Sequence, residues 1–309
     1  MRSKAASSKI TSPLVKRLVE RSGVDPANSS AEDIITALVE RVRRKRARSR
    51  DAQLQHFLKD RRIASVEAVP NLGCDGFIEP IGMSFEAGFR MRLKKQTSRS
   101  RLRFTMAHEV CHTFFYELVP EMKFTLHDID DEEERLCNYG GAVLLLPAPA
   151  VVSQAKQLPV CLESLETPAQ RFLVSLPTML LRLRALGLWK CQLSQWHRML
   201  DGKFTLARMF GSIRTDWEWD DISLLERVWD SKEAAFGCTV LYRKDEAGAR
   251  ECRPISYELK RSADGIVALW GGGVKQPSRA YPLFRKPQIS VGNRNHDPLP
   301  PLSDQLDLR

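Results

Sequence analysis

The segment RLRFTMAHEVCHTFFYE carries a His-Glu-x-x-His motif, formed by His108, Glu109 and His112. Positions i and i+4 of a helix face the same way, so the imidazoles of His108 and His112 can reach one metal ion. Two neutral imidazole nitrogens suit zinc, although a site of this kind also binds manganese or another divalent ion. The motif therefore predicts a helix that supplies two ligands to one metal.

Glu109 lies next to the first histidine, where its carboxylate can hold a water molecule beside the metal. Metallopeptidases need this arrangement, because the metal polarises the scissile carbonyl while a carboxylate takes the proton of the water. The alternative is that the two histidines are simply packed or hydrogen-bonded. The predicted apolar face of the helix consists of Phe104, Ala107, Val110, Cys111 and Phe114.

A catalytic zinc ion usually has three protein ligands and an open position, so a third ligand is required. The candidates lie downstream in HDIDDEEERLCN, which opens a second predicted helix that ends near Pro147. We predict Glu134 as the ligand, with Glu133 and His127 as alternatives. Asn138 shares a helix face with Glu134 and can orient a ligating imidazole by a hydrogen bond.

The second predicted helix also carries a small residue, Gly141, on the face of Glu134 and Asn138. A small residue allows two helices to approach closely, so we expect this helix to pack directly on the motif helix. The remaining acidic residues of the run need no functional explanation, because negative charge in a first helical turn is favourable.

The pattern R-x-R-F-T-x-A-H-E-x-x-H, followed downstream by E-x-x-x-N and L-L-L-P, resembles the ImmA/IrrE family of metallo-endopeptidases. In this chain the pattern consists of Arg101, Arg103, Phe104, Thr105, Ala107, His108, Glu109, His112, Glu134, Asn138 and Leu144–Pro147. The resemblance is strongest over residues 85–150 and implies an α+β fold with a zincin-like core, made of a small β-sheet and the motif helix. It implies that His108, His112 and Glu134 bind zinc and that Glu109 is the base.

The net charge of +10 comes from 48 Lys and Arg against 38 Asp and Glu, and it is concentrated near the N-terminus. Residues 1–62 hold 16 basic and 7 acidic side chains, so the rest of the chain is close to neutral. A uniformly basic nucleic-acid-binding protein is therefore excluded. The basic run from Arg41 to Arg50 is either a solvated helix end or a contact site for nucleic acid or an acidic partner.

The composition argues against other classes of protein. No run of about 18 apolar residues occurs, so we expect no transmembrane helix and no membrane partner. The N-terminal segment lacks the apolar stretch of a secretory signal. The 7 cysteines are scattered and include no Cys-x-x-Cys pair, which indicates a reducing, cytoplasmic location.

Five regions follow from these patterns. They are a basic helical N-terminal arm at 1–65, the peptidase core at 66–150, a helical helix-turn-helix-like segment at 151–200, a β-rich domain of regulatory type at 201–285, and a flexible tail at 286–309. The β-rich domain is expected from the runs KFTLARMF, CTVLYRK, PISYELK and GIVALW. Its tryptophans are expected to form a core rather than a ligand cage; those considered are Trp217, Trp219, Trp229 and Trp270.

The segment 162–188 resembles a helix-turn-helix. Ser175 is expected to cap its second helix. The residues expected to face inward are Met179, Leu180 and Leu183. Arg182 and Arg184 lie near the end of that helix. The alternative to a purely structural role for this segment is contact with DNA.

A peptidase must hold an extended peptide across the metal, and an edge strand can do this by adding the substrate as a further strand. The alternating segment Phe89–Lys95 is the candidate strand. Its basic side, formed by Arg90, Arg92 and Lys94, is expected to bind a substrate segment of acidic character. The equally open alternative is a solvated face whose charges protect an exposed edge.

The oxyanion of the reaction also needs a donor. The sequence offers Tyr116, Tyr139 and His127 and does not choose among them. The two tyrosines also suit packing positions.

The sequence thus predicts a zinc-dependent endopeptidase, for which the resemblance implies a narrow substrate range. The family resemblance implies that its substrate is a DNA-binding transcriptional repressor and that cleavage serves a stress or mobile-element response. The alternative is a non-catalytic, metal-binding transcriptional regulator that binds DNA through the basic N-terminal arm and residues 162–188. Glu109 discriminates between them, because a structural metal site does not need that carboxylate.

Overall fold

The computed structural model describes residues 18–19, 22–25, 29–44, 54–82, 87–95, 98–116, 131–156, 158–211, 219, 222–244, 250–271 and 274. The chain divides into two compact units, which meet in sequence between Pro147 and Ala148. The described residues form eight helices and two sheets, so the α+β prediction is confirmed. Several predicted features lie outside the described residues: the basic run beyond Arg44, His127, Trp217 and the tail 286–309.

The first unit contains a three-stranded sheet of β1 (Ile63–Val69), β2 (Gly76–Pro80) and β3 (Phe89–Lys94). The strand order is β1-β3-β2, with β3 parallel to β1 and antiparallel to β2. Every second side chain of β3 is fully buried, beginning with Phe89, as the alternation in the sequence predicts.

The prediction that β3 is an edge strand is wrong, because β3 is paired on both sides. Its basic side chains have acidic partners on the neighbouring strands. The Nε atom of Arg90 lies 3.4 Å from Glu67, and the Nη2 atom of Arg92 lies 3.3 Å from Glu79. Lys94 is exposed at the end of the strand. Alternation reveals which face of a strand is buried, but it does not reveal the position of the strand in the sheet.

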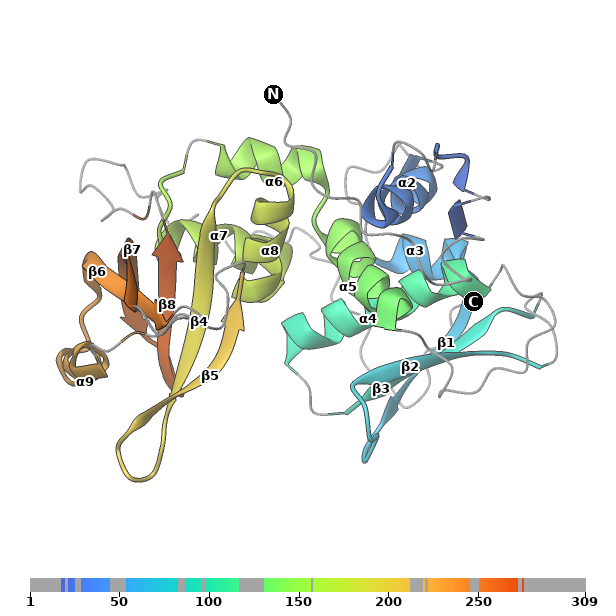
Figure 1. Ribbon diagram of the computed structural model, residues 1–309. Helices are drawn as coiled ribbons and strands as arrows, with labels where there is room; N and C mark the ends of the chain where they lie inside the picture. Colours follow the sequence, from blue (N-terminus) through green and yellow to red (C-terminus); the bar gives the residue numbers. More distant parts are fainter. Residues whose placement is uncertain are drawn as a thin grey trace, which may run out of the picture. The chain divides into compact units, whose positions relative to one another are not determined.

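Four helices complete the first unit: α2 (Ala31–Arg44), α3 (Leu54–Asp60), α4 (Arg99–Tyr116) and α5 (Asp131–Leu145). Helix α4 contacts β2 and β3 on one side and α5 on the other, and α5 in turn packs against α2 (Figure 1). The two helices expected around the motif and around the acidic run are therefore present and in direct contact.

Helix α2, which lies in the predicted basic arm, runs parallel to α5 and is joined to it near both ends. Arg43 donates hydrogen bonds to the carbonyl oxygens of Val143 and Leu144, at 2.9 and 3.1 Å. Near the other end, Glu32 forms an ion pair with Arg135. The last carbonyls of a helix have no partner within the helix, so the Arg43 guanidinium both satisfies them and offsets the negative end of the helix dipole.

Two glycines of α5 permit its close contacts. A Cβ atom on Gly140 would lie 2.8 Å from both the Sγ atom of Cys111 on α4 and a side-chain carbon of Ile35 on α2. A Cβ atom on Gly141 would lie 3.1 Å from the backbone nitrogen of His108. The close approach expected from Gly141 is present, and it occurs directly at a predicted metal ligand.

The second unit is built on a five-stranded sheet of β4 (Cys191–Arg198), β5 (Phe204–Phe210), β6 (Ala235–Lys244), β7 (Arg250–Arg261) and β8 (Gly265–Gly271). All neighbouring strands are antiparallel, in the order β5-β4-β8-β7-β6. The four strand runs predicted for this region correspond to β5 to β8. Strand β4 was not predicted, because it lies in a part of the sequence that reads as mostly helical.

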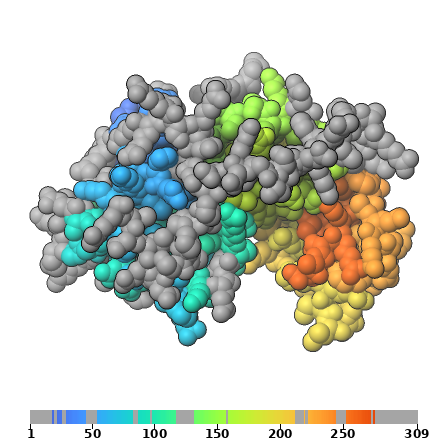
Figure 2. Space-filling model, turned by 180° about the vertical axis from the view of Figure 1, so that it is seen from behind, coloured from blue at the N-terminus to red at the C-terminus, as the bar shows by residue number. Residues whose placement is uncertain are grey.

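Helix α9 (Ile222–Ser231), also not predicted, covers part of this sheet. Its buried residues join a hydrophobic core that includes Trp270, and Trp219 and Trp229 pack against that core. These three tryptophans are therefore packing residues, as expected. The hairpin between β4 and β5 ends in the exposed side chains of Met199 and Leu200, and the yellow surface in Figure 2 includes this part of the unit.

The remaining helices of the second unit are α6 (Ala148–Ala155), α7 (Leu162–Phe172) and α8 (Leu176–Ala185). Ser175 caps α8 by accepting a hydrogen bond from the backbone N–H of Thr178, as predicted. The inward residues are also as predicted: Met179, Leu180 and Leu183.

The arginines of α8 do not lie on an open helix face. Arg182 is buried, and Arg184 donates a hydrogen bond of 2.6 Å to the carbonyl oxygen of Cys191. The exposed positions of this helix are instead apolar, at Leu181 and Ala185. Within the described residues, no helix by itself is long and apolar enough to cross a membrane, and α5 and α6 meet that criterion only as a bent pair.

Substitution of Gly140 by valine should lower the free energy of unfolding by about 1–3 kcal/mol, because the added side chain overpacks the contacts of α5 with α2 and α4. Urea unfolding in the presence of a chelator measures the effect without a contribution from bound metal. The matched control is Gly73→Val, since a Cβ atom there meets nothing within 4 Å. Equal midpoints for Gly140→Val and the wild type would show that the helices are not closely packed at this point.

Candidate metal centre

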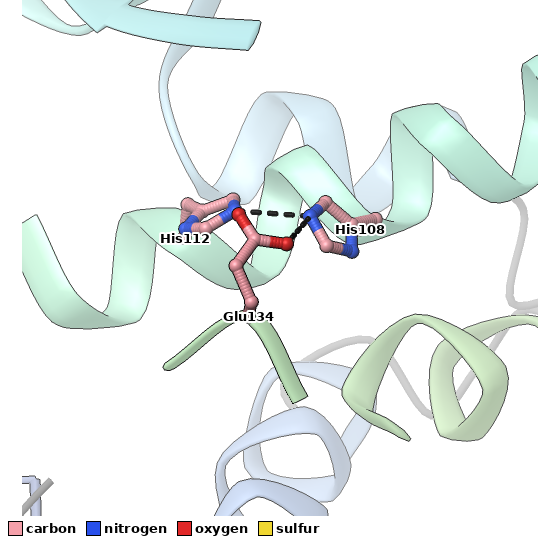
Figure 3. A group of neighbouring side chains, drawn as sticks. All are labelled: His108, His112 and Glu134. Carbon is pink, nitrogen blue, oxygen red and sulfur yellow. Dashed lines mark hydrogen bonds and ion pairs between the residues drawn. The ribbon is translucent and has the colours of Figure 1, made fainter. Parts of the chain in front are cut away.

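Helices α4 and α5 bring His108, His112 and Glu134 together, with one ligand atom of each within 4.8 Å of the others. The carboxylate of Glu134 points at both imidazoles (Figure 3). Its oxygens lie 3.3 Å from the Nε2 atom of His108 and 3.4 Å from the Nε2 atom of His112. The two Nε2 atoms are 3.0 Å apart.

The local sequence explains this convergence. His108 and His112 lie one turn apart on α4, so both rings leave the same side of the helix. Glu134 stands in the first turn of α5, where four consecutive acidic residues face the positive end of the helix dipole. The contact at Gly141 holds α5 close to the backbone of α4, and this places the carboxylate within reach of both rings.

The second ring nitrogen of each histidine contacts α5 as well. The Nδ1 atom of His108 lies 3.1 Å from the Oδ1 atom of Asn138, and the Nδ1 atom of His112 lies 2.7 Å from the Oε1 atom of Glu133. Both partners are acceptors, so each Nδ1 carries a proton, and in the neutral form of each ring Nε2 keeps its lone pair. Two lone pairs and a carboxylate then face a common point.

Such a set of acceptors fits a divalent cation. Ligand atoms of a tetrahedral zinc ion lie about 3.3 Å apart when the bonds are about 2.0 Å long. The distances from the Glu134 oxygens to the two Nε2 atoms, 3.3 and 3.4 Å, match this spacing. Two imidazoles and one carboxylate also form a donor set that zinc takes in catalytic sites. The residues present therefore fit a metal ion, with an open fourth position.

The shifts in the pKa values of Glu134 and His112 also indicate that this group of side chains favours a bound positive charge. Hydrogen bonds from His108 and His112 hold the pKa of Glu134 well below its usual value. Burial lowers the pKa of His112, but its contacts with Cys137, Glu133 and Glu134 outweigh burial and leave that pKa well above 6.5. A proton or a metal cation therefore stabilises this cluster.

A second group of potential ligands, His112, Glu133 and Cys137, lies directly behind the first. The contact of 2.7 Å between His112 and Glu133 is a hydrogen bond, shorter than the spacing of two ligands on one zinc ion. Cysteine binds metals as a thiolate, and burial raises the pKa of the Cys137 thiol to about 11. These residues therefore support His112 from behind rather than form a metal site of their own.

Glu109 is only 5 % exposed and lies beside His108 on α4. Burial raises the pKa of its carboxyl group, and the nearby His112 and His108 oppose this rise in part. A carboxylate with a raised pKa takes up a proton more readily, which is the property that a general base needs.

Tyr116 is occupied by packing. Its hydroxyl donates a hydrogen bond of 3.3 Å to the carbonyl oxygen of Ile78 on β2, and its ring stacks on Phe89 and His112. Tyr139 is half-buried on α5. Tyr116 is one of the two tyrosines that could donate a hydrogen bond to the oxyanion. Its hydroxyl is directed toward the sheet instead.

The contact of Glu133 with the Nδ1 atom of His112 was not foreseen, since Glu133 was considered as an alternative metal ligand. A signal for it was present in the sequence. Glu133, Cys137 and Gly140 follow one another at helical spacing, and all three are buried. An acidic residue on the buried side of a helix needs a partner in the core, and the neighbouring His112 supplies it.

Comparison with known proteins supports the resemblance found in the sequence. Residues 82–184 match the family model Peptidase M78, described as the IrrE N-terminal-like domain. This part of the chain, which includes both histidines and Glu134, is therefore similar to a metallopeptidase-like domain of the ImmA/IrrE family. The match begins after β2 and ends within α8, so it includes β3 and none of the other strands.

A comparison of the sequence with curated proteins found no match. Among solved structures, a Mycobacterium tuberculosis transcriptional regulator aligns over 84 % of this chain and 79 % of its own length, with 14 % identity and a TM-score of 0.48. These values are too low to carry an argument about function.

Replacement of Glu134 by glutamine should weaken zinc binding by more than about 100-fold, because loss of a supporting hydrogen bond alone costs 10–100-fold and this change removes a charged ligand. Competition with a chromophoric chelator measures the affinity. Glu132→Gln, two positions earlier on α5, is the control and should bind zinc like the wild type. Full affinity in Glu134→Gln would exclude this residue as a ligand.

Proposed function

We propose that this protein is a zinc-dependent endopeptidase that hydrolyses a peptide bond in a specific protein substrate. The observation that carries the proposal is the convergence of the two Nε2 atoms and the Glu134 carboxylate, with the buried Glu109 beside them. A His-His-Glu ligand set with an adjacent carboxylate is suited to hydrolysis, whereas a purely structural site has no use for that carboxylate.

In this proposal His108, His112 and Glu134 hold the metal ion. When bound, the ion supplies a Lewis acid that polarises the substrate carbonyl and acidifies a water molecule; manganese or another divalent ion can serve in place of zinc. Glu109 takes the proton from the attacking water and passes it to the departing amine nitrogen. Asn138 keeps the His108 ring in the orientation that directs Nε2 at the metal.

The structure changes the proposed path of the substrate. Because β3 is the central strand, a peptide can extend this sheet only at β1 or β2. Strand β2 is the better candidate, since it contacts α4 and its Ile78 carbonyl meets Tyr116 on the motif helix. In this proposal Arg90, Arg92 and Lys94 influence the substrate through the charge of the sheet face, which Glu67 and Glu79 offset in part.

The family resemblance extends the proposal to the nature of the substrate. Relatives of this family cleave DNA-binding repressors, so we propose a transcriptional repressor as the substrate and a stress or mobile-element response as the setting. The β-rich region 201–285 is proposed as a regulatory domain. A cytoplasmic location suits both a repressor substrate and the scattered cysteines.

The alternative, a non-catalytic regulator that binds DNA, has weaker support. Such a protein needs basic side chains that are free to reach phosphates. Several of the described arginines that were considered for this role are directed into the protein instead: Arg41 to the Ser22 carbonyl, Arg43 to the end of α5, Arg182 into the core and Arg184 to the Cys191 carbonyl.

Replacement of Glu109 by glutamine should preserve zinc binding and lower the rate of cleavage by more than about 100-fold, because the base is lost while the ligands remain. Mass spectrometry of new protein N-termini, after the wild type or the variant is expressed in cells, identifies the substrate and measures the difference. Glu163→Gln, on the exposed start of α7, is the matched control and should cleave normally. Cleavage by Glu109→Gln at the wild-type rate would rule out this residue as the base.

A further inference from the structure

The two histidines of the metal centre have different partners on their second ring nitrogens. His112 contacts the carboxyl group of Glu133, which is acidic and only 1 % exposed. His108 contacts the side-chain amide of Asn138, which is neutral and exposed. The two rings therefore experience different electrostatic environments although they lie one turn apart.

The burial of Glu133 carries an energetic cost. An ionised carboxylate taken out of water loses several kcal/mol of hydration unless a charged or hydrogen-bonding partner compensates it. Here the hydrogen-bonding partner of Glu133 is the Nδ1 N–H of His112, at 2.7 Å. The position of an acidic residue at this depth, in contact with the back of a ring of the candidate metal site, indicates that it acts through that ring.

We propose that Glu133 is a positioning residue that strengthens the metal bond of His112. The carboxylate accepts the Nδ1 proton, fixes the ring so that Nε2 faces the metal, and increases electron density on Nε2. His112 is then the stronger and better-ordered ligand of the pair, and His108 is the weaker one. This inference rests on the metal site of the proposed function, but it does not depend on catalysis.

The charge balance of the site supports the proposal. A metal ion binds an imidazole in its neutral form, so the carboxylates of Glu134 and Glu133 supply the two negative charges that balance a bound divalent cation. Interactions of buried charges are screened far less than those in water, so the Glu133 charge acts on the metal even though it does not touch it. Glutamine at this position would keep an acceptor for the Nδ1 proton and remove only the charge.

The test measures zinc affinity by chelator competition in the full chain, without any substrate. Glu133→Gln should bind zinc about 10-fold more weakly and Glu133→Ala about 100-fold more weakly than the wild type, as expected for the loss of a supporting partner. Glu133→Asp, which keeps the charge, should lose less than Glu133→Gln. The control Asp131→Asn, at an exposed position of the same helix, should bind like the wild type.

A second comparison separates an effect through His112 from general damage to the site. In a His108→Ala background the loss caused by Glu133→Gln should persist, whereas the loss caused by Asn138→Ala should disappear, because Asn138 acts through the deleted ring. Thermal unfolding in chelator monitors the metal-free fold. If Glu133→Gln does not fold, Glu133→Asp is compared with Asp131→Asn and should show a measurable loss.

Wild-type zinc affinity in Glu133→Gln would overturn the proposal. So would a loss of affinity in Glu133→Asp as large as that in Glu133→Ala, since charge would then not be the cause. A different result would contradict the peptidase proposal alone. In that case the Glu133 variants would show the predicted losses of zinc affinity, but Glu109→Gln would cleave protein as the wild type does.

Discussion

The metal centre depends on the close packing of α5 against the motif helix α4. That contact places Asn138 and Glu133 behind the two imidazoles and Glu134 in front of them. The hydrogen bonds at the back fix the Nδ1 protons, and as a result the lone pairs at the front meet the carboxylate. The same 15-residue helix thus carries the proposed third ligand and the groups that contact the other two proposed ligands.

The rest of the first unit maintains this contact. Gly140 and Gly141 leave room for the neighbouring helices, and Arg43 together with Glu32 joins α2 to the two ends of α5. On the side opposite α5, helix α4 packs against strands β2 and β3, so the sheet also holds the helix that carries the two histidines. Segment 31–44, basic at its end, thus contributes to the architecture of the site whether or not it also binds a partner.

Much of the site could be predicted from the sequence because its determinants are local. Helical spacing alone places His108 and His112 on one face of their helix, and Glu134 and Asn138 on one face of the next. Adjacent helix positions point about 100° apart, so Glu133 and Glu134 have different roles although their chemistry is the same. Strand order depends on pairings that are distant in sequence, and for this reason the central position of β3 could not be read from its alternating pattern.

X-ray absorption spectroscopy of the zinc-loaded protein tests the central claim, that His108, His112 and Glu134 are the protein ligands, most directly. The expected spectrum shows nitrogen and oxygen neighbours at about 2.0–2.1 Å, two of them imidazoles, and no sulfur. In Glu134→Gln the metal signal should be lost or its coordination altered. A sulfur neighbour at about 2.3 Å would contradict the account, because it would make Cys137 a ligand and move the metal to the group behind His112.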